Sequence, residues 1–101
     1  MTLEDVKAIV LRCDPNATHY YSGRDGDYTV WQEYSERYHA SDDDFEKGYR
    51  FQIDRYTMQE NDPMVTQIEQ GLRGAMVAFS HRTMFDLDSL HIHHIFDCES
   101  R

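Results

Sequence analysis

The fold is decided by "FEKGYRFQIDRYTM" (residues 45–58) and the stretch that follows it, "NDPMVTQIEQGLRGAM" (residues 61–76). In the first stretch Tyr49, Phe51 and Ile53 alternate with polar residues, which predicts a strand with one buried face. In the second, apolar residues recur every three or four positions after an Asp-Pro start, which predicts a helix. The chain therefore changes from strand to helix near its middle.

The same periodicities extend in both directions. A helix is predicted at the N-terminus, where Thr2 and Asp5 form the pattern of a capping box and the Pro15 region ends the apolar stripe. That stripe consists of Leu3, Val6, Ile9, Val10 and Cys13. Four further strands are predicted: two joined by a glycine-containing loop at 17–22 and 28–40, and two joined by an acidic turn at 77–85 and 89–99.

The predicted element order is α-β-β-β-α-β-β. With 101 residues the chain has enough length for one modest core, so we expect a single α+β domain over residues 1–101. A helix with one apolar stripe must cover a sheet face to leave water. We therefore expect a mainly antiparallel sheet with two helices packed on one face.

Charge and hydropathy disfavour nucleic acids and membranes as binding partners. Nineteen Asp and Glu against ten Lys and Arg give a net charge of −9, which repels phosphate backbones and anionic lipid headgroups. No apolar run approaches the roughly 18 residues of a membrane span, and the N-terminus lacks the features of a signal peptide. We expect a cytoplasmic protein with no nucleic-acid or membrane partner, and with Cys13 and Cys98 as buried, reduced thiols.

The histidines near the C-terminus raise the question of a metal site. Alternation along 89–99 places His94 on the apolar face and His91 and His93 on the other face. His91 and His93 could bind zinc with His81 from the neighbouring predicted strand, since imidazole nitrogen suits zinc. No HExxH or CxxC spacing accompanies them, so we expect no metal and no cofactor, and treat this zinc site as the alternative.

No motif predicts catalysis. The serines lie in no nucleophile elbow and neither cysteine has a local catalytic signature, so we expect a protein that is not an enzyme. The abundant tyrosines are typical either of a protein interface or of cross-strand pairs that brace a solvated sheet face. The acidic run at 41–44 indicates a solvated hairpin tip, which could also contact a basic partner surface. The residues expected at such an interface are Tyr34, Tyr38, Asp42, Asp43, Asp44, His91 and His93.

The element order and several stretches resemble the small tail-completion or tail-terminator proteins of long-tailed bacteriophages and prophages. The matching stretches are "HYYSG" at 19–23, the strands and hairpin at 27–57, "DPMVTQIEQGLRGAM" at 62–76 and "HIHHIFDCE" at 91–99. The likeness is one of element order and loose residue pattern over nearly the whole chain. The family shares no fixed functional residues, so the resemblance assigns no site residue here.

The resemblance implies a structural role. Such a protein forms a homo-oligomeric ring, of six copies when assembled, that caps the tail tube and joins it to head-connector proteins. It would be cytoplasmic in the bacterial host and part of the virion tail after assembly, with the hairpin around 36–47 as an arm that contacts a neighbour. The alternative from a different class is a small cytoplasmic protein-binding or regulatory module, zinc-dependent through His81, His91 and His93.

Overall fold

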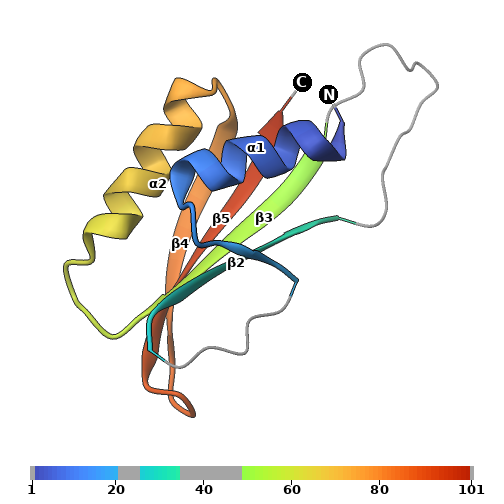
Figure 1. The fold of residues 1–101 in the computed structure, drawn as a ribbon. Helices are drawn as coiled ribbons and strands as arrows, with labels where there is room; N and C mark the ends of the chain where they lie inside the picture. The colour runs from blue at the N-terminus through green and yellow to red at the C-terminus, as the bar shows by residue number, and fades with distance from the viewer. Residues whose placement is uncertain (1, 21–25, 35–48, 101) are drawn as a thin grey trace.

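The computed structural model describes residues 2–20, 26–34 and 49–100, which form two helices on one face of a five-stranded sheet (Figure 1). The elements are α1 (Leu3–Cys13), β1 (Thr18–His19), β2 (Tyr28–Glu33), β3 (Tyr49–Thr57), α2 (Pro63–Gly74), β4 (Ala78–Asp86) and β5 (His91–Ser100). The spatial order of the strands is β1-β2-β3-β5-β4. The predicted α+β class and the order α-β-β-β-α-β-β are confirmed.

At the start of both helices, side-chain oxygens accept hydrogen bonds from backbone N–H groups that have no partner within the helix. At α1 the Thr2 hydroxyl accepts from the Asp5 N–H (3.2 Å) and the Asp5 carboxylate accepts from the Thr2 N–H (2.8 Å), the predicted capping box. These bonds to Thr2 lower the pKa of Asp5. At α2 the Asp62 carboxylate accepts from the Met64 N–H (3.1 Å), and Pro63 occupies the first turn.

The sheet is antiparallel at three of its four pairings. β3 pairs with β2 and β5, and β4 pairs with β5. The exception is β1, which has two residues and runs parallel to β2, with Thr18 opposite Val30. The two stretches at 17–22 and 28–40 therefore do not form an antiparallel hairpin. The chain leaves β1 at once because Tyr20 adopts a left-handed backbone conformation (φ 69°).

The core lies between the helices and the sheet. It consists of Val6, Val10 and Cys13 from α1, Ile68 and Leu72 from α2, and Trp31, Phe51, Ile53, Phe96 and Cys98 from the sheet, with Val77 at its edge. Both thiols are free and buried, as predicted, and burial raises the pKa of Cys13 to about 11 and raises that of Cys98 further. A side chain at Gly71 would meet Cys13 Sγ at 2.6 Å, so glycine allows α2 to approach α1 closely.

A buried arginine fixes the ends of both helices to the sheet. Arg55 of β3 donates through Nε to Asp62 Oδ2 (2.8 Å) and through Nη1 to Thr29 Oγ1 (3.2 Å). Its Nη1 also lies 3.8 Å from Asp14 Oδ2, at the end of α1. A buried guanidinium requires such partners, since charge without them is costly away from water. This ion pair sets the position of the helices over β3.

Candidate functional site: the helix-free face and the β4 edge

The helix-free face is the sheet face that carries neither helix. Its row on β3 includes Gln52, Asp54 and Tyr56, because the alternate residues Phe51, Ile53 and Arg55 face the helices. Strand pairing brings Tyr28 opposite Tyr56, and His93 lies opposite Tyr56 on the other side. Polar and aromatic side chains from β2, β3 and β5 therefore share this face.

These polar groups form a continuous hydrogen-bonded row. The Tyr34 hydroxyl donates to Asp97 and lies 3.1 Å from Gln52 Oε1. Gln52 Nε2 donates to both carboxylate oxygens of Asp54 (2.9 and 3.0 Å), and Asp54 Oδ1 accepts from His93 Nε2 (2.8 Å). Burial, followed by the bond to Asp97, raises the pKa of Tyr34 to about 12. The row fixes the rotamers of side chains from β3, from β5 and from Tyr34, which directly follows β2.

An aromatic stack continues the row. Tyr56 stacks on His93 (ring centroids 4.1 Å apart) and on Tyr28 (4.8 Å), and the His91 ring meets both tyrosines edge-on. His91 Nε2 donates to the Gly26 carbonyl (2.9 Å), and its buried Nδ1 has no hydrogen-bond partner within the described residues. This face is therefore rigid, with its polar groups bonded mainly to one another.

The structure places the sequence-predicted interface residues as follows. His91 and His93 lie on the predicted face, opposite to His94, but His91 is only 7% exposed and contacts the protein's own tyrosines. Tyr34 is half-buried and bonded to Asp97. Tyr38 and Asp42, Asp43 and Asp44 lie outside the described residues. Their role at an interface stays a prediction.

The alternative zinc site formed by His81, His91 and His93 is wrong. His81 lies opposite Phe96 in the β4–β5 pairing, so it projects from the helix-covered face, whereas His91 and His93 project from the other face. The sheet itself separates these side chains. Across residues 2–20, 26–34 and 49–100, no three His, Cys, Asp or Glu side chains are placed to hold one metal ion. The structure instead brings His81 to His94, a contact that the sequence analysis did not predict.

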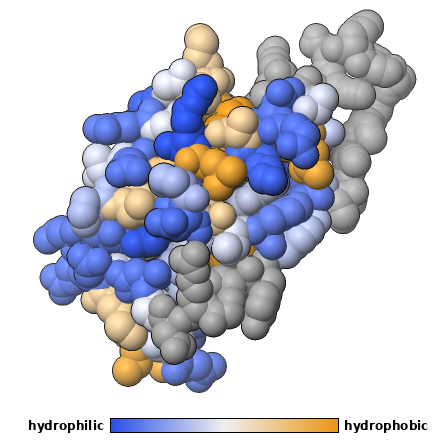
Figure 2. All heavy atoms as spheres, viewed as in Figure 1, coloured by the Kyte–Doolittle hydropathy of each residue, from blue (hydrophilic) through white to orange (hydrophobic). Residues whose placement is uncertain are grey.

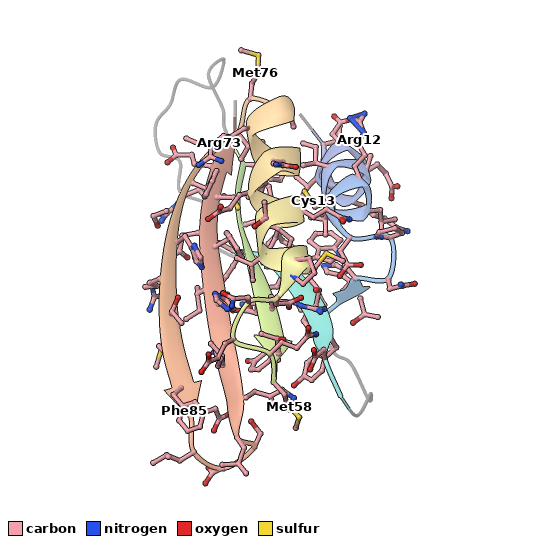
Figure 3. All side chains as sticks on the ribbon, turned by 90° about the vertical axis from the view of Figure 1, so that its left-hand side faces the viewer. Arg12, Cys13, Met58, Arg73, Met76 and Phe85 are labelled. Atoms are coloured by element: carbon pink, nitrogen blue, oxygen red, sulfur yellow. The ribbon has the colours of Figure 1, made fainter. Side chains whose placement is uncertain are left out.

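A second feature missed from the sequence is the outer edge of the sheet. β4 has nine residues and forms one of the two edges of the sheet, at the left in Figure 3. Four apolar residues near the β4–β5 turn are exposed, and we call them the hairpin tip: Met84, Phe85, Leu87 and Leu90. Hydrophobic spheres accordingly appear at the lower end of Figure 2, where Figure 1 places this turn. The available signal was a pair of leucines, 87 and 90, within a turn that usually holds polar residues.

A hollow of ≈ 200 Å³ lies beside Arg55, and its charged groups are occupied by internal contacts. Arg55 is bonded to Asp62 and Thr29. Asp27 accepts from the Met58 N–H (2.9 Å), the Thr57 hydroxyl (3.0 Å) and Gln59 Nε2 (2.9 Å). The hollow is lined by Asp14, Asn16, Asp27, Tyr28, Thr29, Arg55 and Met64. These bonds give the loop before α2 its shape, so the hollow is explained by the fold.

Within the described part of the chain, neither helix has the length and apolar character needed to cross a membrane. Comparison of the chain with protein-family models and with curated protein sequences finds no match.

Proposed function

We propose that this protein is a non-enzymatic assembly subunit of a phage or prophage tail, which forms a ring that caps the tail tube and joins it to the head. The supporting observation is the outer edge of the sheet, where a nine-residue strand ends in an exposed apolar hairpin tip. The resemblance of the sequence to tail-completion and tail-terminator proteins supplies the biological setting.

The β4 edge offers main-chain groups to a neighbour. Among residues 2–20, 26–34 and 49–100, β4 is paired on one side only, with β5, and most of its side chains are exposed. A long edge strand without such a neighbour exposes a row of N–H and C=O groups that readily pair with another chain. A neighbouring subunit that covers this edge would satisfy those groups.

The hairpin tip offers apolar area for the same contact. Leu87 is 76% exposed and Phe85 56% exposed, and Phe85 lies at the opposite end of the molecule from Met76, which follows α2 (Figure 3). Exposed apolar residues that gather in one place, unlike scattered ones, indicate a contact surface. In a closed ring each copy uses two different surfaces, so the edge and tip of one copy would meet another part of the next copy.

The partners proposed are further copies of the chain, six in the assembled ring, together with the tail-tube and head-connector proteins. The protein is then cytoplasmic in the bacterial host before assembly and part of the virion tail afterwards. Its net charge of −9 favours partners with basic surfaces.

The test is native mass spectrometry of the full chain, alone and mixed with the tail-tube protein of the same phage or prophage, with electron microscopy of the tubes. Wild-type protein is expected to give rings, at least on the tubes, and to cap one tube end. A variant with Phe85→Lys and Leu87→Lys is expected to lose both, because the new charges lie in the proposed contact.

The matched control is Met76→Lys, which makes the same kind of change at the opposite end of the molecule, where Met76 is 88% exposed (Figure 3). This variant should assemble as wild type does. A monomer that leaves the tubes uncapped, or a double variant that assembles normally, would count against the proposal.

A further inference from the structure

Two histidine rings meet on the helix-covered face near the outer edge of the sheet. His81 Nε2 of β4 and His94 Nδ1 of β5 are 3.0 Å apart. The pairing explains this approach: His81 lies opposite Phe96 and Thr83 lies opposite His94, so the two histidines are diagonal neighbours on one face. Thr83 Oγ1 is 3.4 Å from the same nitrogen of His94.

A glutamate from α2 fixes the first of these rings. His81 Nδ1 lies 3.0 Å from Glu69 Oε2. An ionised carboxylate only accepts hydrogen bonds, so His81 Nδ1 carries the proton and, in the neutral ring, Nε2 carries the lone pair. The ring also stacks on Phe96, with centroids 4.4 Å apart and planes inclined by 14°. His81 therefore directs its free nitrogen at His94.

The His94 ring is held in its neutral form, which is the form that binds metal ions. Burial, and then the neighbouring His81, lower the pKa of His94, with Arg55 and His93 acting in the same direction and Asp62 opposing them. His94 is therefore a neutral imidazole at neutral pH. The tautomer that carries its proton on Nε2 presents a lone pair at Nδ1 to the same point as His81 Nε2.

We propose that His81 Nε2 and His94 Nδ1 together bind one divalent transition-metal ion, with Glu69 as the residue that positions His81. In a tetrahedral zinc site with bonds of about 2.0–2.1 Å, two ligand nitrogens lie about 3.3 Å apart. A small outward movement of the partly exposed rings reaches that separation from 3.0 Å. A carboxylate on the far nitrogen of a ligating histidine is the usual support of such a site.

The composition of the site predicts which ions it takes. No third His, Cys, Asp or Glu in the described residues is placed to complete the set, so water fills the remaining positions. Imidazole ligands suit copper, nickel and zinc, and the divalent series favours copper(II) over nickel(II) and zinc(II). The site shares only His81 with the zinc site that the sequence offered as an alternative, because His94 takes the place of His91 and His93.

The test is calorimetric titration of the full chain with NiCl₂, ZnCl₂ and CuCl₂ separately at pH 7.5 in a non-coordinating buffer. One equivalent of each ion should bind, most tightly for copper. His81→Gln and His94→Gln are each expected to weaken binding at least tenfold, since each removes one of two protein ligands. Glu69→Ala should weaken it by about 10- to 100-fold, because the positioning bond is lost.

The matched control is His19→Gln. His19 also contacts a glutamate, with Nε2 2.7 Å from Glu33 Oε1, but its ring stacks on Tyr20 and Trp31 and meets no second imidazole among the residues that the structure describes. This variant should bind metal with wild-type affinity. Wild-type affinity in both His81→Gln and His94→Gln, or no binding by the wild type, would overturn the proposal and leave the two rings as a simple hydrogen-bonded pair.

A second measurement on the wild type does not depend on whether the variants fold. Long-range ¹H–¹⁵N spectra of the imidazoles, with and without one equivalent of ZnCl₂, report which nitrogen binds the ion. We expect shifts at His81 Nε2 and His94 Nδ1. Shifts confined to other histidines would refute the assignment.

Discussion

The two faces of the sheet are built from the same strands but carry different kinds of side chain. Against the helices lie rings and aliphatic chains that are almost fully buried, among them Trp31, Phe51, Ile53 and Phe96. On the helix-free face lie tyrosines, histidines and acids that bond to one another. The covered face excludes water by packing, whereas the other face fixes its side chains by directed contacts.

This difference has an energetic consequence. Burial of an apolar side chain stabilises by about 1.5–3 kcal/mol, and its removal also leaves a cavity. A hydrogen bond contributes about 0.5–1.5 kcal/mol net, because the unfolded chain bonds to water instead. We therefore expect the covered face to supply most of the free energy of unfolding and the helix-free face to supply mainly geometry.

The largest expected effect is at Phe96. Phe96→Ala should lower the free energy of unfolding by about 3–5 kcal/mol, because the side chain is fully buried among the core residues. Phe85→Ala is the matched control, since Phe85 projects from the same face but is more than half exposed, and it should change stability by less than about 0.5 kcal/mol. Urea denaturation measures both. Equal losses in the two variants would contradict the contrast between core and hairpin tip.

The approach of the helices over the covered face gives the next effect. Gly71→Ala places a methyl group 2.6 Å from Cys13 Sγ, so it should destabilise by about 1–2 kcal/mol despite the better helix propensity of alanine. Gly74→Ala meets no atom within 4 Å and should stabilise by about 0.5 kcal/mol. The two thermal transitions should therefore move in opposite directions. A Gly71→Ala protein as stable as wild type would mean that the helices are not closely packed here.

The sequence predicts which residues of one strand share a face of the sheet. It does not predict which residues of two different strands come into contact. The period of two along β5 correctly placed His94 apart from His91 and His93, because alternation is a local property. Which histidines share a face with His81 depends on the register between β4 and β5. A register shift by one residue would place the His81 side chain on the other side of the sheet. The exposed edge of β4 likewise follows from strand order, which local patterns do not determine.

The next prediction concerns the helix-free face at high pH. Tyr34 has a pKa raised to about 12, so between about pH 10 and 12 the unfolded chain loses this proton while the folded chain keeps it. The unfolded state then binds fewer protons, and stability falls as pH rises through this range. Tyr34→Phe should lose about 1 kcal/mol at pH 7, because the bond to Asp97 is absent, and should show a shallower fall above pH 10. Denaturation curves at pH 8 to 11 measure this, and parallel curves for the two proteins would argue against the bond.

The smallest effect concerns His94, the one histidine of β5 that faces the helices. Its pKa is lowered by burial and by His81, so below about pH 6.5 the unfolded chain takes up a proton before the folded chain does. The unfolded state then binds more protons, and stability falls as pH falls. Because the ring is partly exposed, we expect this contribution to be small. His94→Gln should therefore lose slightly less stability than wild type between pH 7 and 5 when both are measured in EDTA, which removes any bound metal. If stability falls equally with pH in the two proteins, the pKa of His94 is the same in the folded and the unfolded chain. His94 would then lie in contact with water, unlike the buried side chains of the covered face.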